Sequence, residues 1–138
     1  MSRRRLQIAV IALFTPWIAF AGELPFDWSG IDAHEVVEVL TTDADGDARE
    51  TPVWLVVVDQ RGFVCTNDTR WFANLQRDPH FELRAGDAEH ALRAEAIDSG
   101  ELRARVDAAF RAKYPWGRWL MELFGGDGGD HCLALAPR

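Results

Sequence analysis

The chain has 138 residues, of which 22 are Asp or Glu and 15 are Lys or Arg, so its formal net charge at pH 7 is −7. A chain of this length forms one domain around one hydrophobic core. Because an acidic surface without a basic stripe repels phosphate backbones, we expect no nucleic-acid partner and no attraction to an anionic membrane surface.

The first 21 residues have a composition unlike the rest. Three arginines at positions 3–5 precede the apolar run Leu6–Phe20, which closes on an A-x-A tripeptide ending at Ala21. A charged start, a short apolar run and an A-x-A end are the parts of a secretory signal, and the run is short for a bilayer span. We expect residues 1–21 to be a signal peptide and the mature protein to be periplasmic or secreted. In the alternative, residues 6–20 stay uncleaved and anchor the protein in the membrane.

The same segment also resembles a twin-arginine signal. Ser2-Arg3-Arg4-Arg5-Leu6 matches the S-R-R-x-φ start of those signals, which a receptor reads as an address. An ordinary export signal with three arginines is the alternative. Cleavage after either kind of signal removes three arginines and no acidic residue, so the formal net charge changes from −7 to −10.

We divide the remainder into a linker with a short helix, residues 22–35, and one folded domain, residues 36–138. Ser29 or Asp32 can cap the short helix, which extends to about Glu35.

The domain begins with two strands joined by a hairpin turn. Val36–Thr42 is rich in β-branched residues, and Asp43–Asp47 after it contains Asp-Gly, a strong hairpin signal. Thr51–Asp59 is the predicted return strand. Its apolar run Val53–Val58 is nearly continuous, which predicts burial on both faces.

A third strand, Phe63–Thr66, leads directly into a short helix. Asp68 or Thr69 starts this helix, which is predicted over Arg70–Arg77. Asp78-Pro79 ends it, because proline has no amide donor and restricts the residue before it.

Two further strands, Phe81–Arg84 and Ala91–Ile97, precede the longest predicted helix, which runs from Glu101 to about Phe124. Ser99 or Asp98 can cap this helix, and we expect Pro115 to kink or split it near Tyr114. His131–Leu135 is the last predicted strand. About six mostly antiparallel strands with flanking helices indicate an α+β fold rather than a repeated βαβ pattern.

Two cysteines, Cys65 and Cys132, fall in predicted strands. In an oxidising compartment they can form one disulfide if their strands are neighbours, and spacing along the chain does not show whether they are. Because cysteine is among the most buried residue types, we expect two buried thiols and keep the disulfide as the alternative.

The end of the third strand and the start of the following helix gather groups that suit an anion. Thr66, Thr69, Asn67 and Arg70 supply two hydroxyls, an amide and a guanidinium beside the free N–H groups of a helix start. An ordinary helix cap with a surface arginine is the simpler interpretation.

The order of these motifs resembles the pyridoxamine-phosphate-oxidase-like, or flavin-reductase-like, split β-barrel family, over about residues 36–98. The chain looks most similar to small proteins grouped with deazaflavin-dependent nitroreductases. The matching pieces are Asp43-Ala44-Asp45-Gly46, Pro52-Val53-Trp54, Cys65-Thr66-Asn67, Thr69-Arg70-Trp71 and Asp78-Pro79.

The resemblance implies a homodimer with flavin mononucleotide (FMN), or a deazaflavin, at the subunit interface. Backbone groups of one strand would line the cofactor ring, and the helix start would hold the phosphate. The implied cofactor-binding residues are Val53, Trp54, Leu55, Thr66, Asn67, Arg70 and Trp71. The implied function is oxidoreduction of a small organic acceptor, such as a quinone, and it needs no catalytic side chain because the cofactor performs hydride transfer.

The chain departs from this family at its basic residues. Flavin-binding members often carry an arginine and a lysine at positions that fall here near Thr51 or Pro52 and near Val57, and Trp71 replaces a lysine at the helix start. A phosphate would therefore face mainly Arg70.

Two further arginines, Arg49 and Arg84, are candidate helpers for that phosphate. If the flavin site has been lost, the alternative function is a non-enzymatic binding module that holds haem or another hydrophobic ligand. His80 or His131 could then be an axial ligand. No two of the four histidines have metal-ligand spacing, so we expect no other metal site.

The apolar cluster Tyr114–Phe124 is dense in aromatic side chains. Core and dimer packing explain most of it. The alternative is that it forms the wall of a pocket for a hydrophobic substrate such as a quinone.

Overall fold

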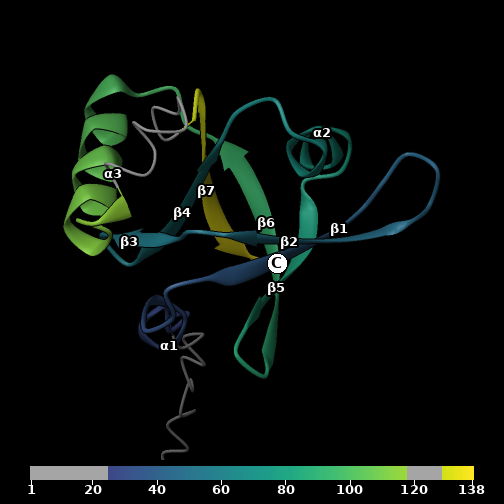
Figure 1. Ribbon diagram of the computed structural model, residues 1–138, viewed down its shortest axis with the longest axis horizontal. Coiled ribbons are helices and arrows are strands. Elements are labelled where there is room, and N and C mark those ends of the chain that lie inside the picture. The colour runs from purple at the N-terminus through teal and green to yellow at the C-terminus, as the bar shows by residue number, and fades with distance from the viewer. Residues whose placement is uncertain (1–24, 118–128) are drawn as a thin grey trace, which may run out of the picture.

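The computed structural model describes residues 25–117 and 129–138 (Figure 1). The predicted signal peptide lies outside the described residues. So does the part of the apolar cluster Tyr114–Phe124 that follows residue 117. None of the described helices is long and apolar enough to cross a bilayer.

The described chain forms seven strands and three helices, so the α+β expectation is confirmed with seven strands instead of about six. All neighbouring strands are antiparallel, in the order β2-β1-β5-β6-β7-β4-β3. In chain order the elements are α1 (Ser29–Asp32), β1 (Val37–Thr42), β2 (Ala48–Val53), β3 (Val56–Val58), β4 (Arg61–Thr66), α2 (Arg70–Arg77), β5 (His80–Ala85), β6 (Ala88–Ala96), α3 (Gly100–Lys113) and β7 (His131–Pro137).

The extra strand arises because the predicted strand Thr51–Asp59 is divided at Trp54 and Leu55. Val53 ends the pairing of β2 with β1, and Val56 begins the pairing of β3 with β4. These two strands form the opposite edges of the sheet. Two residues therefore carry the chain from one edge to the other, which curls the sheet into a barrel.

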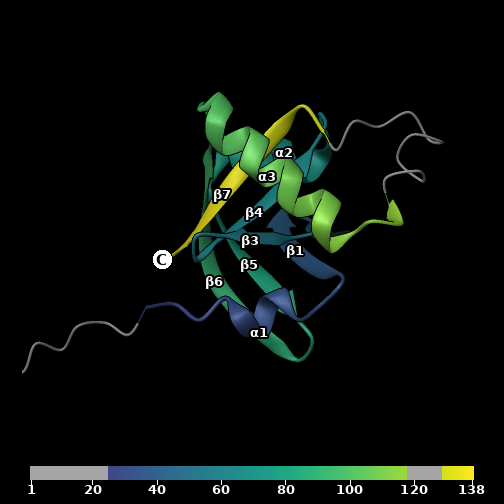
Figure 2. The same ribbon diagram turned by 90° about the vertical axis from the view of Figure 1, so that its left-hand side faces the viewer.

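Residues on both sides of this corner alternate between two hydrophobic clusters. Val53, Leu55 and Val57 pack in the barrel core, whereas Trp54 and Val56 belong to a second cluster beneath α3. The predicted burial of this run on both faces is confirmed, because one face fills the barrel and the other supports the helix. Figure 2 shows α3 lying across β7, β4 and β3.

The longest helix, α3, ends next to Pro115, where the sequence predicts a break. α3 is capped by Ser99, whose hydroxyl accepts a hydrogen bond from the Leu102 amide at 3.3 Å. Tyr114 is its C-terminal cap, directly before Pro115, which confirms the expected break. The rest of the predicted helix lies largely in residues 118–128, which the structure does not describe.

The expectation of two buried thiols is wrong. Cys65 on β4 lies directly opposite Cys132 on β7, and their sulfur atoms form a disulfide. The pairing depends on β4 and β7 being neighbours, although 67 positions separate the two cysteines.

Candidate functional site

The residues predicted to hold a phosphate meet where β4 ends and α2 begins. Thr66 is only 6% exposed, and its hydroxyl lies 3.0 Å from the hydroxyl of Thr69. Thr69 occupies the N-cap position of α2 but makes no side-chain capping bond, so its hydroxyl leaves the first-turn N–H groups uncapped. Arg70 follows as the first residue of α2 and is exposed.

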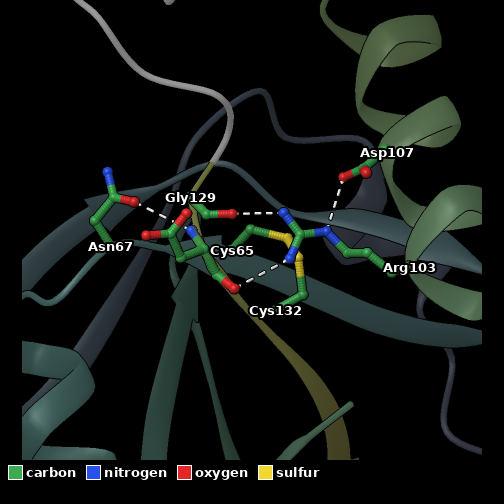
Figure 3. Close-up of a disulfide and its surroundings, with 7 residues drawn as sticks. Cys65, Asn67, Arg103, Asp107, Gly129 and Cys132 are labelled. Carbon is green, nitrogen blue, oxygen red and sulfur yellow. Dashed lines mark hydrogen bonds and ion pairs between the residues drawn. A yellow bond between two sulfur atoms is a disulfide. The ribbon is translucent and has the colours of Figure 1, made fainter. Parts of the chain in front are cut away.

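The side chain of Asn67 is oriented by the residues just before β7, which no motif in the sequence links to this site. Its side-chain oxygen accepts a hydrogen bond of 3.1 Å from the Asp130 amide. The amide nitrogen of Asn67 is therefore left free of this bond, and Figure 3 shows it directed away from Gly129. No sequence pattern predicts this contact, because it joins residues that are 63 positions apart in the chain.

His131, the first residue of β7, lies opposite Thr66 at the same end of β4. Its ring stacks on Phe72, with centroids 4.3 Å apart, and its Nε2 atom lies 2.8 Å from an Asp68 carboxylate oxygen. This pair places an acidic side chain next to the α2 start, so Arg70 must outweigh it for an anion to bind.

The segment Val53–Leu55, predicted to line the cofactor ring, already makes contacts with the end of α3 in the same subunit. The Leu55 carbonyl accepts hydrogen bonds from Lys113 at 2.8 Å and from the Tyr114 hydroxyl at 3.2 Å, and the Leu55 amide lies 3.4 Å from the same hydroxyl. Trp54 stacks on Tyr114 at 4.5 Å between ring centroids. A planar ring at this strand would therefore meet the aromatic side chains at the end of α3.

Trp71 lies apart from the other predicted cofactor residues. It is 5% exposed and belongs to the barrel core with Leu75 and Phe72, so its ring fixes α2 onto the sheet.

The two candidate helper arginines are paired with carboxylates. Arg49 donates to both oxygens of Asp43 at 2.7 and 2.8 Å, and Arg84 binds Glu38 and Glu89. Hydrogen bonds from Arg49, and then from Asn74, lower the pKa of Asp43 to about 2. Of the three arginines considered, Arg70 therefore remains for a phosphate, although its charge also contributes to the lowered pKa of Asp43.

A polar groove of about 450 Å³ lies at the other end of α2. His80 stands on its rim, with Nδ1 placed 3.2 Å from an Asp78 oxygen, and Arg77 donates to Asn74 within it. Among residues 25–117 and 129–138, no three His, Cys, Asp or Glu side chains gather in a way that could hold a metal ion.

The model of a protein family described as "Uncharacterized protein conserved in bacteria (DUF2255)" matches residues 27–124. The chain belongs to the DUF2255 family. A comparison of this DUF2255 protein with curated proteins found no match.

Solved structures similar to this DUF2255 protein confirm the split β-barrel expected from the motifs. An F420-H2-dependent reductase, FDR-A, matches with a TM-score of 0.58 and 17% identity over 75% of this chain and 95% of that chain. HutZ, a haem-storage protein of Vibrio cholerae, matches with a TM-score of 0.60 and 17% identity over 79% and 85%. A putative pyridoxamine 5'-phosphate oxidase of Listeria innocua matches with a TM-score of 0.55 and 12% identity over 79% and 88%. Identities this low establish the fold alone.

Proposed function

We propose that this DUF2255 protein binds FMN or a deazaflavin through the start of α2 and acts as an oxidoreductase on a small organic acceptor. The observation that carries the proposal is the uncapped α2 N-terminus beside Arg70 and the Thr66–Thr69 hydroxyl pair. N–H groups at a helix start, hydroxyls and a guanidinium together suit a phosphate. The similar fold of an F420-H2-dependent reductase supports the choice of cofactor.

The side chains at the start of α2 suit the cofactor phosphate better than the residues around Leu55 suit the cofactor ring. Arg70 would pair with the phosphate, and Asn67 would donate through its amide nitrogen. Lys113 and Tyr114 hold the Leu55 carbonyl, so they would fix the strand on which the ring rests. When bound, the cofactor supplies hydride transfer; the protein supplies position and exclusion of water. The site is completed in our proposal by a second copy of the chain in a homodimer.

We propose a planar, hydrophobic acceptor such as a quinone. Trp116 is 45% exposed and packs edge-on against Trp54, with ring centroids 5.7 Å apart. Trp54 in turn stacks on Tyr114. An exposed indole next to the ring-lining strand offers an aromatic surface on which such an acceptor can stack.

Titration of the purified protein with FMN and with F420 tests the cofactor proposal. We expect Arg70→Gln to weaken binding about tenfold or more, because a hydrogen bond between charged groups contributes about 1.5–3 kcal/mol. Arg111→Gln on exposed α3 surface is the matched control and should leave the affinity unchanged. Failure of the wild-type protein to bind either cofactor, or equal affinity in Arg70→Gln, would contradict the proposal.

Haem binding is the second candidate, because His80 lines a groove and has a carboxylate next to one of its ring nitrogens. The Nδ1 atom of His80 lies 3.2 Å from an Asp78 oxygen, and a carboxylate on one ring nitrogen leaves the other, Nε2, for a metal. Carboxylates on the groove wall, including Glu82, oppose this function by repelling haem propionates. A Soret band that appears on adding haemin and is lost in His80→Ala but kept in His90→Ala would favour haem over flavin.

We also propose that the protein is exported by its first 21 residues. The Cys65–Cys132 disulfide supports this, because disulfides persist in oxidising compartments. Export that stops when Arg3 and Arg4 are replaced by Lys would support the twin-arginine route, and unchanged export would favour the general secretory route.

A further inference from the structure

We propose that the Cys65–Cys132 disulfide regulates the affinity of the phosphate site by holding residues 129–131 against the end of β4. The inference rests on the proposed function, since it concerns the residues that would hold the cofactor phosphate. In the disulfide form, this segment orients Asn67 as a donor. Reduction removes the covalent restraint on this segment, increases its motion and weakens phosphate binding.

The disulfide stands directly beside the site on both strands. Cys65 immediately precedes Thr66, and Cys132 immediately follows His131. The strand pairing continues by one residue past the disulfide, from Cys65 opposite Cys132 to Thr66 opposite His131. A covalent bond at this point therefore fixes where the chain before β7 approaches the site.

Gly129 lies against the backbone of Thr66. A Cβ atom built on Gly129 would stand only 2.5 Å from the Thr66 carbonyl carbon and 2.6 Å from its nitrogen and oxygen. Gly129 also has a φ of 98°, which favours glycine. The segment consequently covers the last residue of β4 with no space between the two backbones.

Arg103 of α3 holds the same segment from the other side. It donates to the carbonyls of Gly129 and Asp130, and Asp107, one helical turn later, accepts from its Nε at 3.0 Å. Figure 3 shows the guanidinium of Arg103 between Asp107 and the disulfide-linked segment. The disulfide and Arg103 thus both restrain one short stretch of chain.

This stretch determines which end of the Asn67 amide is available. While the Asp130 amide donates to the Asn67 oxygen, the nitrogen of Asn67 remains to donate to an anion. If the segment moves away, the amide can rotate and present its oxygen, which repels a phosphate. The site therefore changes from a preorganised donor to a mixed one.

A small dithiol can drive this change by thiol–disulfide exchange. Its thiolate attacks the sulfur of Cys65, the half-buried partner, and forms a mixed disulfide while the Cys132 thiolate leaves. The second thiol of the reductant then displaces Cys65. The two cysteines gain two electrons and two protons, and the reductant becomes a disulfide.

The decisive experiment compares the oxidised protein with the same protein reduced by dithiothreitol. FMN and inorganic phosphate are titrated into both, and amide hydrogen exchange is followed at Asp130. We expect the reduced protein to bind both ligands about two- to tenfold more weakly, the range for losing one oriented hydrogen bond. Asp130 should lose protection while β5 and β6 keep theirs.

Two variants test the mechanism without breaking the disulfide. Gly129→Ala should weaken FMN binding in the oxidised protein, because its Cβ collides with Thr66. Gly46→Ala is the matched control: its φ of 95° is equally unfavourable for alanine, but nothing lies within 4 Å of the added Cβ. Arg103→Gln should act like Gly129→Ala, and Arg105→Gln, which loses only the surface pair with Asp59, should not.

The outcomes separate the inference from the proposed function. Equal affinities in the oxidised and reduced protein would overturn the inference and leave the cofactor proposal standing, and normal FMN binding in Gly129→Ala would do the same. Absence of FMN and phosphate binding by the oxidised wild-type protein would overturn both.

Discussion

The Asp43 side chain stabilises the fold and also pairs with an arginine near the candidate site. Its carboxylate joins the β1–β2 turn to α2, because it accepts from both Arg49 and Asn74. The pairing with Arg49 removes a cation that a phosphate could otherwise use. The aspartate that begins the hairpin turn thus also leaves the proposed phosphate site to rely on Arg70.

We expect Asp43→Asn to lower the melting temperature at pH 7, because Arg49 loses its charged partner. The pKa of Asp43 is lowered from 3.8 to about 2 in the folded protein, so its contribution is complete above pH 3.8 and is lost as the pH falls toward 2. The difference in melting temperature between wild type and variant should therefore shrink over this interval. Asp47→Asn, in the same turn, is the control; an Asp43 effect that persists unchanged at pH 2 would contradict the assignment.

At the scale of elements, the corner between β2 and β3 depends on α3. The helix ends where Lys113 and Tyr114 reach the Leu55 backbone, and the Tyr114 hydroxyl also donates to the Glu35 carbonyl at 2.7 Å. One tyrosine therefore joins the chain before β1, the corner and α3. Because the same corner would support the cofactor ring, packing and function meet at this point.

Tyr114→Phe tests that junction while keeping the aromatic stack on Trp54. Tyr114 is buried, so removing its hydroxyl leaves backbone groups of Leu55 and Glu35 short of a partner. We expect the free energy of unfolding to fall by about 1–3 kcal/mol, measured by urea denaturation. An unchanged midpoint would show that water replaces the hydroxyl at no cost.

The contact between α1 and the barrel depends on a glycine in β4. The ring of Trp28 covers Gly62 so closely that a Cβ there would lie 2.4 Å from a ring carbon. Gly62→Ala should displace Trp28 and lower the melting temperature by several degrees, since overpacking costs about 1–3 kcal/mol. Gly30→Ala, within α1 and with open space around its Cβ, should leave the melting temperature unchanged or raise it.

At the scale of the whole molecule, the barrel is closed by contacts between distant parts of the chain. β4 pairs with β7 and β1 pairs with β5, so much of the sheet joins segments that are not consecutive. The disulfide strengthens one of these pairings. Its reduction therefore bears on stability as well as on the regulation proposed above.

We expect the double variant Cys65→Ser/Cys132→Ser to lose about 4 kcal/mol of unfolding free energy, because the disulfide closes a loop of 67 positions in the unfolded chain. Denaturation of the reduced wild-type protein should give a similar loss. If both losses are near zero, the strand pairing alone fixes this end of the barrel.

The sequence by itself determined the local structure. The Asp-Gly turn, the Asp78-Pro79 stop and the break before Pro115 act on the backbone within a few residues, and the structure agrees with all three. The order of these motifs was also sufficient to identify the split barrel. Only the tertiary structure decided that Cys65 meets Cys132 and that Asp130 orients Asn67. These contacts depend on which strands become neighbours when the sheet closes, and that choice is made by packing of the whole core, which no local pattern records.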